Sequence, residues 1–221
     1  MIETDILIEK ETKMIPEPTL RRFPKYIHLL KRLKNESTNY ISSTTIAEEL
    51  GLDSIQVRKD MAITGVVGKP KLGFDIDELI HSLTHILNWD NVTDAFLVGA
   101  GSLGSAILGY KNFDLYGLNI IAAFDNDPSK IGTVVNGIEV LPIEKLGDMI
   151  ERMHINIGVI TSTPESAQKI AETMINAGIT AIWNFAPRHL KLPSNIIVEN
   201  AQLSYSLGVL THKLAQKIKK E

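Results

Sequence analysis

The stretch Val92–Tyr110 reads VTDAFLVGAGSLGSAILGY and decides the fold of the second half of the chain. A β-branched and apolar run leads into a glycine-rich turn and then into a helical pattern. Gly99, Gly101 and Gly104 have the spacing G-x-G-x-x-G. In this motif the first glycine permits a tight turn, the second lets the backbone approach a pyrophosphate, and the third allows close helix-to-strand packing. We therefore expect a strand–turn–helix unit that holds a dinucleotide at the helix N-terminus.

The next strand pattern, LNIIAAFD at 118–125, ends on Asp125, about 20 residues after Gly104. A carboxylate at this place accepts hydrogen bonds from the ribose hydroxyls of an adenosine and repels a 2′-phosphate. This favours NAD(H) over NADP(H). The alternative is a glycine turn that binds nothing. We predict that this half of the chain binds NADH or NAD⁺.

Strand and helix patterns alternate through the rest of this half. Strand patterns occur in IGVITSTP at 157–164, ITAIWNFAP at 179–187 and NIIVEN at 195–200, and a helix is predicted at Glu165–Asn176. The alternation predicts an α/β domain at 91–200 with a Rossmann-type doubly wound parallel sheet. Its NFAP segment either closes over a nicotinamide or is a plain exit from a strand.

Residues 201–221 are predicted to form a final helix. Five apolar residues fall on one of its faces: Leu203, Leu207, Leu210, Leu214 and Ile218. The stripe packs either within its own domain or on a partner subunit. Because such a stripe is a liability when it is exposed in a monomer, we expect a homodimer in which this helix forms the contact.

The first half has helical periodicity from 18 to 87, after a charged segment at 1–17 that we interpret as a flexible tail. The segment ISSTTIAEELGL has Ser42 or Ser43 as a candidate N-cap and ends near Gly51. A second helix, SIQVRKDMAIT, follows a cap at Asp53 or Ser54. Two short helices around a glycine-containing turn are typical of a helix-turn-helix.

The segment GVVGKPKLGFDID at 65–77 is too rich in glycine for a helix and indicates a tight hairpin, or wing, with two lysines at its tip. A further amphipathic helix follows it. We therefore expect a winged helix-turn-helix domain at 18–87. We expect the domain boundary at 88–91.

Positive charge is concentrated in this first domain. The net charge of the whole chain is −3, but the window from Pro18 to Lys71 is basic. A recognition helix needs donors that reach base edges, while hydroxyls at a neighbouring helix start hold phosphates. The candidate DNA-binding residues are Ser42, Ser43, Thr44, Ser54, Gln56, Arg58, Lys59, Lys69 and Lys71. The alternative is a solvated basic face on a helical packing module.

The composition of the chain argues against several kinds of site and against a membrane span. The chain has no cysteine, which excludes disulfides, thiolate nucleophiles and cysteine-based metal sites. His81 and His85 are spaced i and i+4, but the intervening glutamate of H-E-x-x-H is missing, so no metal is expected. No apolar run approaches the roughly 20 residues that span a bilayer. We expect a cytoplasmic protein without a membrane partner.

The organisation argues against an enzyme. Hydride transfer needs a second domain that holds the substrate and an acid–base group over the nicotinamide. The residues before the nucleotide domain are already assigned to the helix-turn-helix and wing, and one helix follows it. This leaves a cofactor site without a substrate site, which suits a protein that senses the nucleotide.

The residues also resemble the redox-sensing transcriptional repressors of the Rex family. The similarity runs from about Thr19 to Ile218 and rests on SSTTIAEELGLDSIQVRKD, the wing ending LGFDID, VGAGSLGSAILGY, FDNDPSKIG, TPESAQKIAETMINAGITAIWNFAP and LPSNIIVEN. The resemblance implies an N-terminal winged helix, a C-terminal Rossmann domain and a homodimer that exchanges its last helix. It also implies repression that NADH relieves. Since the dimer is two-fold, its operator DNA should be an inverted repeat.

The resemblance also implies site residues. The candidate nucleotide-binding residues are Gly99, Ala100, Gly101, Ser102, Leu103, Gly104, Asp125, Asn126, Lys130, Thr163, Pro164, Asn184, Phe185 and Ala186. The family's switch joins a tyrosine after the glycine motif, an aspartate before the last helix and an arginine in the first helix. Here Tyr110 is kept, whereas Gln202 and His28 stand at the other two places, and Ser102 and Pro70–Lys71 depart from the family pattern.

Two alternatives belong to other classes. One is an NAD-dependent oxidoreductase with a fused helical domain, which turnover of a hydroxy acid would favour. The other is a CoA-binding Rossmann module that serves a synthetase, which tight CoA binding without NADH binding would favour.

Overall fold

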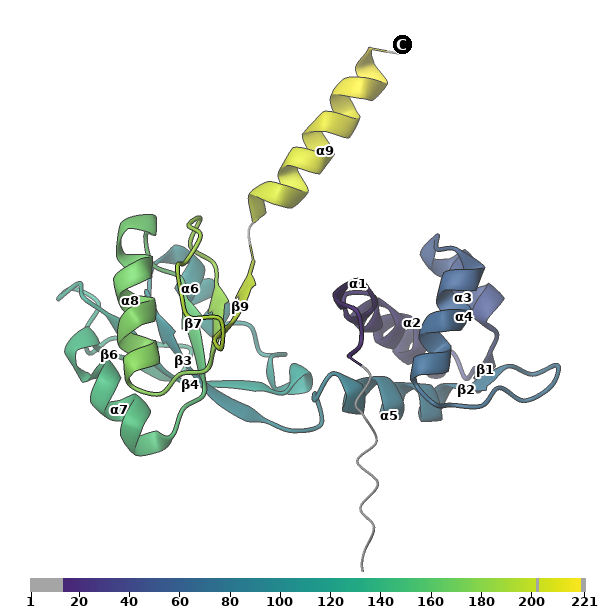
Figure 1. The fold of residues 1–221 in the computed structure, drawn as a ribbon, viewed down its shortest axis with the longest axis horizontal. Coiled ribbons are helices and arrows are strands. Elements are labelled where there is room, and N and C mark those ends of the chain that lie inside the picture. Colours follow the sequence, from purple (N-terminus) through teal and green to yellow (C-terminus); the bar gives the residue numbers. More distant parts are fainter. Residues whose placement is uncertain (1–13, 202, 220–221) are drawn as a thin grey trace, which may run out of the picture. The chain divides into compact units, whose positions relative to one another are not determined.

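The computed structural model describes residues 14–201 and 203–219. The chain divides between Asp90 and Asn91 into two compact units. The first unit is helical with a two-stranded sheet, and the second is built around a seven-stranded sheet, counted over the described residues (Figure 1). None of the helices in the described ranges is long and apolar enough to cross a membrane.

The first unit is a winged helix-turn-helix. Its elements are α1 Glu17–Leu20, α2 Phe23–Asn35, β1 Tyr40–Ile41, α3 Ser43–Leu50, α4 Ser54–Ile63, β2 Phe74–Asp75 and α5 Ile76–Ile86. The expected tail extends to residue 17, but Glu17 already begins α1. Pro18 lies in the first turn of α1, where proline is tolerated because the N–H it lacks has no partner within the helix.

Side-chain caps fix both helices of the helix-turn-helix. The Ser42 hydroxyl accepts a hydrogen bond from the Thr45 N–H at 3.0 Å, and the Asp53 carboxylate accepts one from the Gln56 N–H at 2.9 Å. Gly51 ends α3 in the left-handed conformation. Helices α2 to α5 bury one apolar core, with Phe23, Tyr26, Ile46, Val57, Met61, Leu79 and Leu83 fully buried in it. The predicted caps and turn are confirmed.

The predicted wing forms between α4 and α5. Strand β1 pairs antiparallel with β2, so that Tyr40 lies opposite Asp75. At the tip, Lys69 and Gly73 exchange two backbone hydrogen bonds of 2.7 and 2.9 Å. Lys71 lies inside this tight turn with a positive φ of 64°. The wing therefore carries its lysines at its far end.

The second unit is a doubly wound α/β fold, as predicted. Its elements are β3 Thr93–Val98, α6 Ser102–Leu108, η1 Asp114–Tyr116, β4 Leu118–Asp125, β5 Val134–Val135, β6 Ile138–Pro142, η2 Ile143–Lys145, α7 Leu146–Met153, β7 Ile157–Ile160, α8 Pro164–Asn176, β8 Ala181–Asn184, β9 Ile197–Asn200 and α9 Leu203–Ile218. The strand order is β5-β6-β4-β3-β7-β8-β9, and every pair is parallel except β5 with β6.

Both faces of the sheet are covered by helices, which is why the central strands are apolar on both sides (Figure 1). Along β3, Phe96 and Val98 face the core under α7 and α8, and Ala95 and Leu97 face the core under α6. The parallel strands β3, β4 and β7 therefore end at one edge, where the glycine turn lies.

The final helix α9 is unpacked in the single chain. All side chains described from 204 to 219 are exposed. The apolar stripe is exposed with them: 59% of Leu207, 63% of Leu210, 55% of Leu214 and 62% of Ile218 is accessible. A helix with this much apolar surface is stabilised mainly by packing, so this stripe is the surface that we expect to contact a partner subunit.

Candidate nucleotide-binding site and DNA-binding surface

The glycine turn after β3 has the geometry that its motif requires. Gly99 has a φ of +107°, and a Cβ there would lie 2.8 Å from the Ser162 nitrogen. A Cβ on Gly104 would lie 2.0 Å from the Gly99 carbonyl oxygen, so only glycine lets α6 pack this closely. Gly101, in contrast, has nothing within 4 Å of its Cβ position. The backbone is therefore open to a ligand at the place where a pyrophosphate approaches.

A cavity of about 830 Å³ lies at the carboxyl ends of β3, β4 and β7. This is the edge at which doubly wound sheets bind ligands, and the volume lies in the range of ligand pockets. Six predicted residues line it: Gly99, Gly101, Asp125, Asn126, Lys130 and Thr163. The other eight do not: Ala100, Ser102, Leu103, Gly104, Pro164, Asn184, Phe185 and Ala186.

Sequence reasoning missed several lining residues on the α8 side of the cavity. Ser162, Glu165, Ser166 and Lys169 line it together with Thr163. They lie at the end of β7 and in the first turns of α8. The segment TSTPES between a strand and a helix is the signal that predicts them, because a second helix N-terminus faces the same edge of the sheet.

Asp125 is 5% exposed and already accepts three hydrogen bonds. They come from the Ala100 N–H at 2.8 Å, the Asp127 N–H at 2.9 Å and the Lys130 ammonium at 3.1 Å. Burial opposes the charge of this carboxyl, but the three donors outweigh it and lower the pKa of Asp125. An ionised carboxylate beside the cavity has the chemistry to accept a ribose hydroxyl while it holds the glycine turn.

In the single chain, the NFAP segment fits the second of its two predicted alternatives, a plain exit from a strand. The Asn184 side chain is completely buried and hydrogen-bonds inside the protein, to Ala186, Arg188 and Asn200. Phe185 instead packs on the ring of Trp183, with 4.6 Å between centroids. Neither residue lines the cavity in this single chain.

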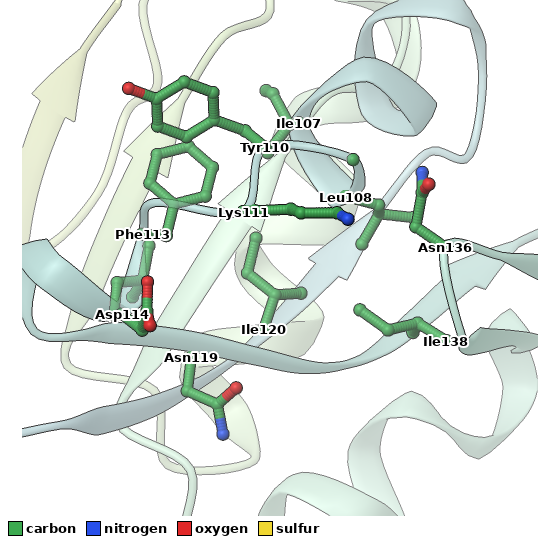
Figure 2. A pocket seen from close by; sticks show the side chains of 12 residues that line it. Ile107, Leu108, Tyr110, Lys111, Phe113, Asp114, Asn119, Ile120, Asn136 and Ile138 are labelled. Atoms are coloured by element: carbon green, nitrogen blue, oxygen red, sulfur yellow. The ribbon is translucent and has the colours of Figure 1, made fainter.

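Tyr110 belongs to a row of aromatic rings. Its ring lies 4.8 Å from Phe113, which lies 5.6 Å from Trp183, and Trp183 contacts Phe185. Figure 2 shows a second cavity beside this row, of about 520 Å³, at the opposite end of α6 from the glycine turn. Tyr110 is 45% exposed there. Of its candidate switch partners, His28 is exposed on α2 in the first unit, and Gln202 lies outside the described residues.

In the first unit, the exposed face of α4 carries Arg58 and Lys59. Within the part of the chain that the structure describes, no hydrogen bond or ion pair engages either cation. The same is true of Lys71 at the wing tip. Other basic residues are paired: Arg21 with Glu17, Arg22 with Asp60, Arg32 with Glu49 and Lys34 with Asp77. Lys69 donates to the Tyr40 hydroxyl at 2.7 Å. Lys25 and Lys31 on α2 are also exposed, and no hydrogen bond or ion pair among the described residues engages them. The unpaired cations of the helix-turn-helix and wing are therefore Arg58 and Lys59 on α4 and Lys71 at the wing tip.

Gln56 is held by the protein itself. Its amide donates to the Asp60 carboxylate at 2.9 Å, and Asp60 is fully buried. Arg22 donates to the same carboxylate at 2.6 and 2.9 Å, and the Tyr26 hydroxyl donates at 2.6 Å. This cluster anchors α4 to α2 and to Arg22, the residue just before α2. The sequence did not single out Asp60, because it directly follows two exposed charged residues, Arg58 and Lys59, in the segment RKD.

Ser42, Ser43, Thr44 and Ser54 lie where the sequence places them, at the starts of α3 and α4. Thr44 and Ser54 are exposed, whereas Ser42 and Ser43 are half-buried. His81 and His85 belong to α5, and His85 pairs with Asp90 at 2.8 Å. Among the described residues no group of side chains is suited to holding a metal ion.

Fold and site together define a class of protein: a winged helix-turn-helix unit joined to a Rossmann-type unit with a cavity fit for a dinucleotide. Two family models match these units. Residues 14–62 match a family described as "Putative DNA-binding protein N-terminus", and residues 90–188 match the CoA binding domain family.

Curated relatives identify the family. The chain is 39% identical over 205 residues to the redox-sensing transcriptional repressor Rex of Bacteroides fragilis, covering 93% of both chains. It is 41% identical to the Rex repressor of Treponema denticola, covering 90% of this chain and 94% of that one. The chain therefore belongs to the Rex family of redox-sensing transcriptional repressors.

Solved structures agree with this assignment. The crystal structure of RSP, a Rex-family repressor, in complex with beta-NAD⁺ and operator DNA has a TM-score of 0.85 at 35% identity. It covers 94% of this chain and 98% of that chain. The RSP complex with beta-NADH gives the same TM-score at 34% identity, with the same coverage. The relatives are repressors, and the oxidoreductase alternative is not favoured.

Proposed function

We propose that this protein represses transcription by binding operator DNA and that it leaves the operator when NADH binds. The observation that carries the proposal is the likeness, over more than nine-tenths of the chain, to a repressor solved both with NAD⁺ and operator DNA and with NADH. We further propose that it acts in the cytoplasm, as a homodimer, and that no substrate is converted.

The cavity after β3 is the proposed nucleotide site. The open backbone at Gly101 receives the pyrophosphate, and the ionised Asp125 accepts a ribose hydroxyl, with Lys130 beside it. A 2′-phosphate would meet the charge of Asp125, which is why NADH and NAD⁺ are the expected ligands. On the other wall, Thr163 and Ser166 offer hydroxyl groups at the start of α8.

The unpaired cations of α4 and the wing form the proposed DNA-binding surface. We assign Arg58 and Lys59, which are exposed on α4, as major-groove contacts and Lys71 at the wing tip as a phosphate contact. Gln56 contributes indirectly, because its amide helps hold Asp60 and so fixes α4. A two-fold dimer presents two such surfaces, which requires an operator that is an inverted repeat.

The test is a selection of bound duplexes from a random pool, carried out with the full chain in the absence of nucleotide. The proposal predicts recovery of an inverted repeat, and it predicts that NADH elutes the recovered duplex from the protein more effectively than NADPH. Recovery of sequences without symmetry, or equal elution by both nucleotides, would contradict it. Turnover of a hydroxy acid with NAD⁺ would instead support the oxidoreductase alternative.

A further inference from the structure

One buried side chain in the second unit connects three separate segments. Asn184 is the last residue of β8 and has no exposed surface. Its amide nitrogen lies 3.0 Å from the Arg188 carbonyl oxygen, 3.3 Å from the Ala186 carbonyl oxygen and 2.9 Å from the Asn200 side-chain oxygen. Its side-chain oxygen accepts from the Ala186 N–H at 3.1 Å. Both polar atoms of this side-chain amide therefore have hydrogen-bond partners.

One of these contacts continues to the nucleotide cavity. The Arg188 guanidinium donates to the Pro164 carbonyl oxygen at 2.9 Å. Pro164 opens α8 between Thr163 and Glu165, which both line the cavity. Arg188 therefore links this wall of the cavity to Asn184, because its guanidinium contacts Pro164 and its backbone carbonyl oxygen accepts from the Asn184 amide.

The other contact continues to the final helix. Asn200 is the last residue of β9, and the backbone Ala201 N–H donates to the Asn184 carbonyl oxygen at 2.9 Å. Helix α9 begins at Leu203, two residues after Ala201. The end of β9, which leads into α9, is thus held to the end of β8 by one side-chain and one backbone hydrogen bond.

We propose that Asn184, Asn200 and Arg188 are positioning residues that transmit the state of the nucleotide cavity to α9. This inference rests on the proposed function, since it assigns the path by which the same site releases DNA. An asparagine suits the junction because its amide donates both to the loop at 186–188 and to Asn200, and also accepts from the Ala186 N–H of that loop. Since a buried amide that loses a partner is costly, the loop at 186–188 and the end of β9 move together.

Two variants each remove one hydrogen bond of the path without creating a cavity in the apolar core. Asn200→Ala removes the acceptor on the α9 side and leaves the strand pairing of β8 with β9 in place. Arg188→Ala removes the donor on the cavity side, where the residue is exposed. The matched controls are Asn195→Ala, an exposed asparagine just before β9, and Arg152→Ala, an exposed arginine on α7.

The readouts are operator affinity without nucleotide, NADH affinity without DNA, and the factor by which saturating NADH weakens operator binding. Wild type and both controls should show a factor of about tenfold or more, as is usual for coupled sites. Asn200→Ala and Arg188→Ala should reduce that factor to about twofold, while each separate affinity stays within about threefold. Because both act on one path, the double variant should lose no more than either single variant.

The outcomes separate this inference from the proposed function. If NADH does not release the wild-type protein from the operator, the proposed function fails. If NADH releases the wild type and both variants from the operator to the same extent, the proposed path is wrong. A variant that loses operator affinity in the absence of NADH, in proportion to its lost response, shows an ordinary structural role and also overturns the inference.

Discussion

Asp60 and Asp125 are two buried carboxylates that hold different parts of the chain. Each is ionised because hydrogen-bond donors outweigh the cost of its burial. Asp60 fixes α4 through Arg22, Tyr26 and Gln56. Asp125 fixes the glycine turn through backbone donors and also faces the cavity. We therefore expect the first to control the stability of the first unit and the second to control the affinity for the nucleotide.

Replacing Asp60 with asparagine should destabilise the first unit by about 3 kcal/mol, because Arg22 is left without its counter-charge in a buried cluster. Burial alone would raise the pKa of Asp60, but its donors bring it below the usual value. Its stabilising effect is therefore present above a pH of about 4 and is lost as the pH falls through the folded-state pKa. The measurement is urea unfolding of wild type and Asp60→Asn at pH 7 and pH 3.

Asp53→Asn on the same helix is the control, because asparagine caps a helix as well as aspartate does. It should unfold like the wild type at pH 7. A difference between wild type and Asp60→Asn that does not shrink at pH 3 would contradict the assignment of an ionised Asp60.

Asp125→Ala should weaken NADH binding by about tenfold to a hundredfold, since a hydrogen bond to a charged group contributes about 1.5 to 3 kcal/mol. Operator affinity without nucleotide should not change. Titration of NADH followed by its fluorescence measures the first, and anisotropy of a labelled operator measures the second. Asp148→Ala, an exposed carboxylate on α7 paired with Arg152, is the control. Unchanged NADH affinity in Asp125→Ala would rule out the ribose contact.

At the scale of the elements, α4 and the wing should contribute differently to DNA binding. Loss of a base contact from Arg58 or Lys59 costs about 1 to 3 kcal/mol and relaxes the sequence preference. Loss of Lys69 or Lys71 at the wing should weaken binding to all DNA alike and reduce the salt slope by about one unit each. Operator and scrambled duplex are compared at two salt concentrations, with Lys145→Ala in the second unit as the control.

Lys69 and Lys71 also differ from each other. Lys69 already donates to Tyr40, and its ammonium lies 4.7 Å from the centre of that ring. Lys69→Ala therefore removes a contact that supports the wing, whereas Lys71→Ala removes a charge alone. If neither Arg58→Ala nor Lys59→Ala changes operator affinity, the assignment of α4 as the recognition helix is wrong.

The elements that the sequence predicts well are those with a strong local signal. Ser42, Asp53 and the glycine turn specify helix starts and a tight turn by their own chemistry. The elements predicted from the sequence do not include β5, β6 or α7. Strand β5 has two residues, β6 ends on a proline, and α7 has eight residues. The two strands depend on neighbours in the sheet rather than on a repeating apolar period. Helix α7 does carry a helical apolar period that sequence reasoning missed, in Leu146, Met149, Ile150 and Met153.

The candidate site shows the same division between local and distant causes. The motif predicts Gly99, Gly101 and Asp125 in the cavity, because their roles follow from spacing along the chain. The burial of Asn184 and the pairing of Gln56 with Asp60 depend on segments that are distant in sequence or hidden within a helix. The presence of a polar residue in a motif therefore does not by itself predict that its side chain faces the cavity or the DNA-binding surface.

At the scale of the whole molecule, the exposed stripe of α9 predicts a dimer. Leu210→Asp places a charge in the middle of the stripe and should give a monomer in sedimentation. Operator affinity should then fall strongly, because two half-sites are no longer bound by one linked pair of units. Gln216→Asp, on the opposite face of α9, should remain a dimer. A Leu210→Asp protein that sediments as a dimer would show that the stripe does not form the contact.

The most direct test of the central claim is a titration of the protein–operator complex with NADH and, separately, with NAD⁺. The operator is the labelled inverted repeat recovered by selection, and its anisotropy is measured at constant salt, since salt alone changes the affinity for DNA. The account predicts that NADH releases the duplex, that NAD⁺ at the same concentration leaves it bound, and that Asp125→Ala shifts the NADH midpoint upward. Release by neither nucleotide, or equal release by both, would contradict it.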